Sequence, residues 1–170
     1  MRLTAFVARR RVTLGFVLGA VALFLARPTW PSLAVGVPIA VAGEALRFWA
    51  AGHLETGREV TVSGPYRWTR HPIYLGSSLM GLGLAVASAS LVVILLVLGY
   101  LSFTLTVAAF AEERHLETRF GEAYQRYRAG DLKPVSRRFS ASRAWRNGEH
   151  RTVAGLLCVA AYLIARAATS

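Results

Sequence analysis

Two short polar stretches of the chain carry the side chains that can bind and activate a charged small molecule. In the first, His71 precedes Pro72, which is well suited to the first position of a helix because its missing N–H would be unpaired there anyway. The free N–H groups at such a helix start, together with Arg67 and Arg70, attract an anion such as a carboxylate or a phosphate. The alternative is an interfacial belt in which neighbouring aromatic residues anchor the stretch among lipid headgroups.

The second stretch begins with two adjacent glutamates, Glu112 and Glu113, directly after a long apolar segment. This is an unexpected place for carboxylates, because the cytoplasmic flanks of membrane spans favour cations. Apolar side chains then recur at a spacing of three to four between residues 116 and 127, which predicts an amphipathic helix that continues the apolar segment or folds onto the membrane face. The two glutamates are candidates for binding or proton transfer, against the alternative of a solvated helix face with local ion pairs.

The apolar segments that must position these side chains are too many for a water-soluble fold. Apolar residues make up 54% of the 170 residues and charged residues only 17%, which is more apolar surface than one soluble core can bury. We expect a single all-α domain over residues 1–170, with five membrane-spanning helices and a cytoplasmic amphipathic helix after the fourth. The predicted spans cover residues 12–30, 32–52, 73–87, 90–111 and 152–166.

The distribution of charge predicts the orientation of these spans. With the amino terminus inside, 17 of the 20 basic residues face the cytoplasm, as the positive-inside rule requires. Topology and attraction to anionic lipid headgroups therefore explain the net charge of +11 without a nucleic-acid partner. An arginine-rich chain of this topology, with no targeting segment, is most simply a bacterial inner-membrane protein. No metal site is predicted, because His53, His115 and His150 lack ligand spacing and the single cysteine lies in an apolar run.

The hairpin of the third and fourth spans brings the two polar stretches to one membrane face. The third span begins on the cytoplasmic side and the fourth ends there, so residues 71–74 and 112–113 can line one pocket, built from residues 53–72 and 112–130. A cationic rim opposite a carboxylate suits a zwitterionic cofactor, and a pocket at this depth can meet a lipid that stays in the bilayer. Residues 131–151 are expected to be a solvated linker without chemistry.

Two ionisable residues, Glu44 and Arg47, interrupt the second apolar segment at a spacing of three. A neutralising pair on one helix face is the simplest account. Because charges at that depth are costly, we also consider them candidates for contact with the substrate.

The sequences of the two polar stretches together resemble a known family. GPYRWTRHPIYLG at residues 64–76, followed by an apolar hairpin and then EERHL at 112–116 and FGEAYQRY at 120–127, is similar to the isoprenylcysteine carboxyl methyltransferases and the related phospholipid methyltransferases. ALRFWA at residues 45–50 also resembles that family. The resemblance implies an integral-membrane enzyme that binds S-adenosylmethionine without a Rossmann sheet. It assigns the cofactor contacts to Arg58, Glu59, Val60, Thr61, Tyr66, His71, Pro72, Ile73, Tyr74 and Glu112.

The same resemblance leaves the methyl acceptor open. In the prenylcysteine enzymes, a substrate-associated arginine lies four residues before the glutamate that matches Glu112, and this chain has Ala108 there. We therefore expect a lipid or amphiphilic acceptor with a carboxylate, amine or hydroxyl group. A carboxylate needs no general base, whereas an amine or hydroxyl must lose a proton, for which Glu113 or His71 would be the catalytic residue.

Two other functions remain open. Reductases of the sterol reductase type use NADPH and share a related R-H-x-x-Y block near a membrane span, here Arg70, His71 and Tyr74, although their second block differs from Glu112 and Glu113. A non-enzymatic membrane module would use the basic cytoplasmic face to recruit partners or anionic lipid.

Overall fold

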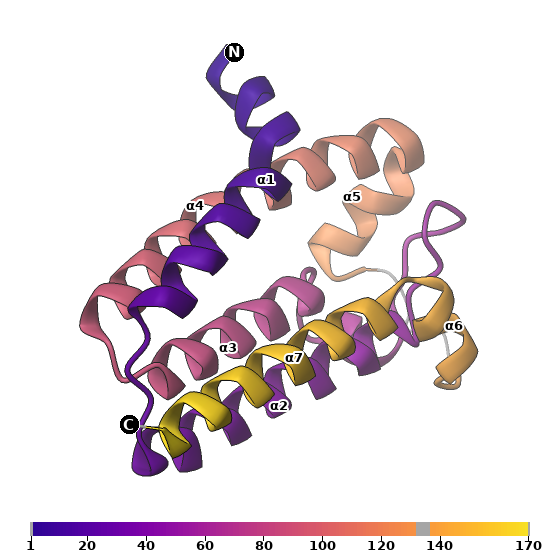
Figure 1. The fold of residues 1–170 in the computed structure, drawn as a ribbon. Helices are drawn as coiled ribbons and strands as arrows, with labels where there is room; N and C mark the ends of the chain where they lie inside the picture. The colour runs from indigo at the N-terminus through magenta and orange to yellow at the C-terminus, as the bar shows by residue number, and fades with distance from the viewer. Residues whose placement is uncertain (1, 132–136, 170) are drawn as a thin grey trace.

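All regular structure in the described part of the chain is helical. The computed structural model describes residues 2–131 and 137–169, and of residues 2–12 the backbone alone. In these ranges there are seven α-helices, one 3₁₀ helix and no strand, so the predicted all-α class is confirmed (Figure 1). The elements are α1 (Arg2–Leu25), α2 (Trp30–Ala51), the 3₁₀ helix η1 (Gly64–Arg67), α3 (Pro72–Ala87), α4 (Leu91–Phe120), α5 (Glu122–Ala129), α6 (Ala141–Arg146) and α7 (Glu149–Ala168).

Three of the described helices, α2, α4 and α7, are long and apolar enough to cross a membrane, while Thr13–Leu25 of α1 and the whole of α3 are shorter apolar helices. Large apolar side chains on the outer surface of the bundle are widely exposed, for example Phe16 and Phe24, each at 77% of its surface. A surface of this kind is stable against lipid and unfavourable in water.

The closest helix pair is α2 with α3, which run side by side through the bundle (Figure 1). Small residues make the approach possible. Gly36 faces the backbone of Gly83 and Ala87, and a Cβ added to Gly43 would lie 2.7 Å from the carbonyl oxygen of Gly76. Glycine stripes on facing helices allow such backbone contact in membrane bundles. The close packing of these two helices fixes the end of α2 relative to the start of α3.

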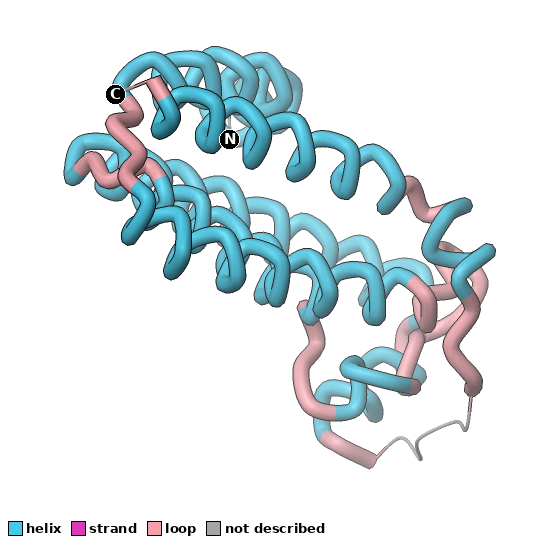
Figure 2. The backbone as a smooth tube through the Cα atoms, turned by 60° about the horizontal axis from the view of Figure 1, so that its bottom comes forward, coloured by secondary structure: helices cyan, strands magenta, loops and turns pink. Residues whose placement is uncertain are grey.

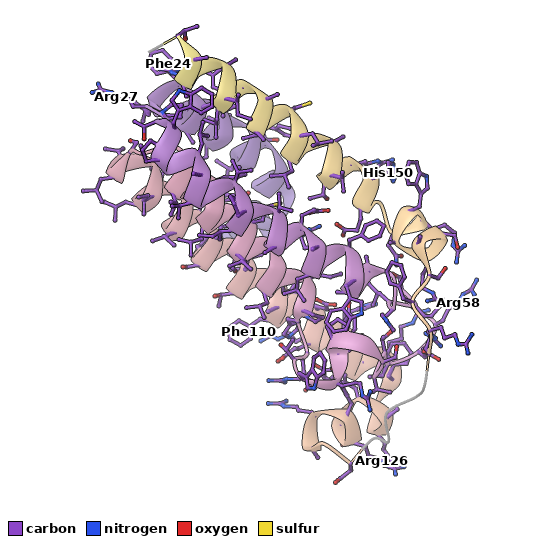
Figure 3. The ribbon with its side chains drawn as sticks, turned by 90° about the horizontal axis from the view of Figure 1, so that it is seen from below. Phe24, Arg27, Arg58, Phe110, Arg126 and His150 are labelled. Carbon is purple, nitrogen blue, oxygen red and sulfur yellow. The ribbon has the colours of Figure 1, made fainter. Side chains whose placement is uncertain are left out.

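The two ends of the bundle differ in character, as the loops in Figure 2 show. At one end the α1–α2 turn meets the α3–α4 turn, where the Arg27 amide donates to the Ser88 carbonyl at 2.8 Å, and Arg166 of α7 donates to the Leu23 carbonyl at 3.2 Å. The other end carries the long loop 52–71, α5 and α6. Figure 3 shows Phe24 and Arg27 at the first end and Arg58 and Arg126 at the second. The start of α3 and the end of α4 therefore share one end, as predicted.

Several helix boundaries differ from the predicted spans: α1 begins at Arg2 and not at residue 12, and α7 begins at Glu149 and not at residue 152. Two further differences have local causes. The first helix ends at Leu25 rather than at residue 30, because Pro28 stops it and Thr29 begins the next helix in a capping box with Ser32. The amphipathic stretch is not one helix. Helix α4 continues to Phe120, and the chain then turns at Gly121, whose φ of +48° favours glycine, before α5 folds back.

The prediction that residues 131–151 form a solvated linker is wrong for most of this segment. Residues 132–136 lie outside the described part, but residues 137–148 include α6 and are bonded to loop 52–59 through Arg137, Arg143 and Asn147. The prediction of a linker came from the polar composition of this segment. The segment is ordered because its side chains bond to distant residues, and composition cannot show such bonds.

Candidate active site

The centre of the candidate site is His71, which lies between two carboxylates. Its Nε2 is 3.1 Å from Oε1 of Glu113, within hydrogen-bond distance. Its Nδ1 is 3.7 Å from Oε2 of Glu112, which is an ion-pair distance and too long for a direct hydrogen bond. Arg70 also pairs with Glu113, at 2.9 Å. His71 and Glu113, which are 42 residues apart in the sequence, are thus brought together at the mouth of α3.

Local structure explains why these side chains meet. His71 is the residue immediately before α3, with Pro72 at the first helical position, so its side chain stays at the helix mouth. Glu112 and Glu113 are opposite because α4 continues past its apolar part instead of ending there. Gly64 allows the preceding turn: its φ is +58°, and a Cβ at this position would lie 2.6 Å from the His53 ring.

A cleft of about 270 Å³ opens beside this cluster. We call it the main cleft. Loop 54–61 forms one wall and α4 the opposite one, and Arg119 of α4 donates to the Gly57 carbonyl of the loop at 2.6 Å. The lining residues are Leu54, Glu55, Thr56, Gly57, Glu59, Val60, Thr61, Tyr66, Arg70, Glu112, His115, Leu116, Arg119, Phe120 and Tyr127.

A smaller hollow of about 80 Å³ lies at the start of α3, and we call it the helix-mouth hollow. It shares Tyr66, Arg70 and Glu112 with the main cleft, so the two adjoin. Its remaining lining residues are His71, Pro72, Ile73 and Tyr74. The imidazole of His71 is stacked on the Tyr74 ring, with 5.4 Å between the ring centres.

Nine of the ten residues predicted to contact a cofactor line one or both of these spaces. Glu59, Val60 and Thr61 line the main cleft, and the residues from 71 to 74 line the helix-mouth hollow, with Tyr66 and Glu112 between them. Arg58 is exposed and lines neither. Glu113 also lines neither, but it contacts His71 directly.

Sequence reasoning missed His115 and Arg119, which line the main cleft. They follow Glu112 at spacings of three and seven, so all three lie on one face of α4. This helical spacing from Glu112 could have identified both residues from the sequence.

The carboxylates and the imidazole change each other's pKa. The pKa of His71 is raised above its usual value because Glu112, and then Glu113, stabilise the charged imidazole against the opposing effect of partial burial. The pKa of Glu112 is lowered, first by His71 and then by the Tyr74 hydroxyl, although burial opposes the change. Burial raises the pKa of Tyr66, which therefore stays protonated. The shifts of His71 and Glu112 both favour a charged His71 beside a charged Glu112.

The donors and acceptors of the two spaces suit a zwitterionic molecule with a polar sugar. Carboxylates of Glu59 and Glu112 can accept hydrogen bonds, while Arg70 and Arg119 can pair with an anion. The Nδ1 atom of His71 is buried and has no hydrogen-bond partner among the described residues, so a ligand can satisfy it. In the same part of the chain, no group of three His, Cys, Asp or Glu residues is arranged to hold a metal ion.

Arg47, predicted to pair with Glu44, is the centre of a larger buried cluster. Its Nε lies 3.4 Å from Glu44, but its best partner is Glu149 of α7, whose carboxylate it meets at 3.0 Å and 3.1 Å through one nitrogen. Ser77 of α3 and Thr152 of α7 also accept from its guanidinium. Neither Glu44 nor Arg47 lines the main cleft or the helix-mouth hollow.

Comparison with known proteins assigns a family to this part of the chain. Residues 42–123 match the phospholipid methyltransferase family. The match covers α2 from Ala42, the loop with its GPYRWTRHPIYLG block, the whole α3–α4 hairpin and Glu112 with Glu113. No curated protein and no solved structure matches the chain. The resemblance predicted from the two polar blocks is confirmed to this extent: residues 42–123, which contain most of both blocks, match the phospholipid methyltransferase family.

Proposed function

We propose that this protein transfers a methyl group from S-adenosylmethionine to a lipid or amphiphilic acceptor at the cytoplasmic face of a membrane. The observation that carries the proposal is the meeting of His71 with Glu112 and Glu113 at the mouth of α3, inside the segment that matches a methyltransferase family. That segment includes most of the residues that line the two adjoining spaces.

The main cleft and the helix-mouth hollow would hold the methyl donor between them. Arg70 and the start of α3 would pair with the carboxylate of its amino-acid end, and Glu112 would accept hydrogen bonds from its amino group or ribose. Bound S-adenosylmethionine supplies the methyl group as part of a positively charged sulfonium. The chain's own contribution is then to orient the two reactants and to exclude water from the space between them.

For the acceptor, the apolar side of the bundle supports a lipid. Two adjoining hollows of about 170 Å³ and 190 Å³ lie between α1, α3 and α4, and α7 also lines the first of them. They are lined almost wholly by apolar side chains and share Gly19, Ala22, Gly81 and Val97. They extend along α3 from Ser88 to Ser77, one helical turn from Ile73. An alkyl chain lying there would bring its polar end toward the mouth of α3, and the family match supports a phospholipid as that acceptor.

His71 and Glu113 would serve as the base if the acceptor is an amine, which must lose a proton before its lone pair can form the new bond. When Nε2–H of His71 donates to Glu113, the unpartnered Nδ1 carries the lone pair that can take this proton. The imidazolium formed would then be stabilised by both neighbouring carboxylates.

We further propose that all five apolar helices cross the membrane, with the amino terminus and the site on the cytoplasmic side. The 16 residues of α3 give about 24 Å at ~1.5 Å per residue, less than a hydrocarbon core of about 30 Å. Local thinning of the bilayer accommodates such a short span at modest cost. The site end of the bundle carries the excess of basic residues that the positive-inside rule requires.

The test is to incubate membranes that contain the protein with a methyl donor labelled in its methyl group and to extract the lipids. We expect labelled lipid with the wild-type protein and a loss of ~100-fold or more with His71→Gln if an amine is methylated, in line with the usual contribution of a general base. Label in lipid that does not depend on the protein, or no label at all, would contradict the proposed function.

A further inference from the structure

The wall of the main cleft formed by loop 54–61 has no regular secondary structure. Inside the loop, the Glu55 amide donates to Thr61 at 3.2 Å and the Arg58 amide donates to the Glu55 carbonyl at 3.3 Å. Two short internal bonds do not fix a loop of this length, because ordering each residue costs about 1–2 kcal/mol. The loop must therefore be held by other parts of the chain.

The segment 137–147 supplies bonds to the backbone at the start of the loop. The Asn147 side-chain amide donates to the carbonyls of Ala51 at 2.8 Å and Leu54 at 3.0 Å. The Arg143 guanidinium donates to the Gly52 carbonyl at 2.5 Å, and the Ser140 amide donates to the same oxygen at 3.2 Å. These carbonyls belong to the last residue of α2 and to the residues just after it, where a helix leaves its final carbonyls without partners inside the helix.

The same segment neutralises the acidic side chains of the loop. Arg143 meets Oε1 of Glu55 at 2.7 Å, and Arg137 meets Oε1 of Glu59 at 2.6 Å. Phe139 adds an apolar contact, with its ring 5.8 Å from Phe48 and 6.3 Å from His53, centre to centre. Glu55 and Glu59 both line the main cleft, so the bonds reach two residues of the site itself.

We propose that residues 137–147 act as a brace that holds the wall of the main cleft in its binding conformation, with Arg143 and Asn147 as positioning residues. No residue of the brace lines the cleft, so its effect passes through loop 54–61. The brace also lies outside the segment that matches the methyltransferase family. The effect of the brace on cofactor affinity rests on the proposed function, whereas its effect on the conformation of loop 54–61 does not. Without the brace, a ligand must order the loop as it binds, and that cost reduces affinity.

The experiment compares Arg143→Gln with Arg146→Gln in the purified full-length protein. Arg146 lies on the same short helix, is exposed and makes no hydrogen bond or ion pair with the described residues of the loop, which makes its substitution a matched control. Two quantities are measured: hydrogen exchange of residues 52–60 without ligand, and the Kd of S-adenosylhomocysteine. We expect Arg143→Gln to speed exchange in the loop and to raise the Kd by ~10–100-fold, with Arg146→Gln unchanged in both.

Arg143→Lys distinguishes positioning from general loss of structure. A lysine keeps the charge near Glu55 but cannot reach Glu55 and the Gly52 carbonyl with two separate N–H groups in a fixed plane, so we expect an intermediate Kd. Thermal unfolding of each variant shows whether the helices remain folded. Unchanged exchange in folded Arg143→Gln overturns the brace, and faster exchange with an unchanged Kd overturns its effect on binding. A wild-type protein that binds no S-adenosylhomocysteine contradicts the proposed function, while the exchange result still decides the brace.

Discussion

At the scale of single residues, the site depends on how four charged side chains share one small space. His71 faces Glu112 and Glu113, and Arg70 pairs with Glu113 from the same side, so the four charges nearly cancel when the imidazole is protonated. Tyr74 lies on the face of the imidazole ring. The arrangement keeps a titratable group between two carboxylates at the start of α3.

The raised pKa of His71 gives a prediction with a definite sign. Carboxylates stabilise the charged imidazole in the folded protein, so this stabilisation is present below the usual histidine pKa and is lost as pH rises through the raised value. We expect NMR titration to give His71 a pKa above its ordinary value of about 6.5. Glu112→Gln should lower it, because the largest favourable interaction is removed. A pKa at or below the ordinary value in the wild type would contradict the geometry.

A second prediction concerns the buried pair Arg47 and Glu149, whose side chains are 15% and 5% exposed. Replacing Glu149 by Gln leaves the guanidinium without its main countercharge, and breaking a buried pair typically costs about 3–5 kcal/mol. We expect a loss of stability near that size, measured by unfolding in detergent. Glu122→Gln on the exposed start of α5 is the control and should change stability by less than ~0.5 kcal/mol. Equal stability of the two variants would show that the pair of Arg47 and Glu149 does not stabilise the fold.

At the scale of elements, the sequence was informative about helices and poor about their contacts. The bounds of α2 and α3 lie within two residues of the predicted spans, because each is a long, mostly apolar run with a proline or glycine close to its ends. The end of α1 and the break at Gly121 depend on local backbone geometry that hydrophobic periodicity does not report. The packing of α2 on α3 through glycines could be seen only once the two helices were placed side by side.

That packing predicts opposite effects of one substitution at two glycines. In Gly43→Ala, the new Cβ meets the backbone of Gly76 and Met80 of α3, which cannot move aside, so α2 and α3 must separate. Overpacking of this kind costs about 1–3 kcal/mol. In Gly19→Ala, nothing lies within 4 Å of the new Cβ, and helix propensity favours alanine by up to about 1 kcal/mol. Thermal unfolding in detergent should therefore rank Gly19→Ala above Gly43→Ala, and the reverse order would contradict the packing.

At the scale of the whole molecule, one end of the bundle holds tight turns, and the other holds the long loop 52–71 and the candidate site. The two polar blocks could be assigned to that end from the sequence, because a short hairpin forces the start of α3 and the end of α4 together. Arg143, Asn147 and Glu149 could not be assigned. Their partners in α2 and the following loop are 88 to 102 residues away, and nothing in a polar stretch shows which distant groups it will contact.

The proposed orientation of the bundle predicts opposite accessibility of its two ends. Arg27 and Arg58 are both exposed and lie at opposite ends (Figure 3). In a Cys158→Ser background, a membrane-impermeant maleimide should label Arg27→Cys in intact cells and Arg58→Cys only after the membrane is opened. Labelling of both positions from one side would contradict five spans with a cytoplasmic site.

The most direct test of the central claim is calorimetry of the detergent-purified protein with S-adenosylhomocysteine and, separately, with NADPH. We expect S-adenosylhomocysteine to bind at one site, with at least ~10-fold weaker binding in Glu112→Ala because a charge-assisted hydrogen bond of about 1.5–3 kcal/mol is lost. NADPH should not bind. Binding of NADPH without binding of S-adenosylhomocysteine would contradict the methyltransferase account and favour a reductase.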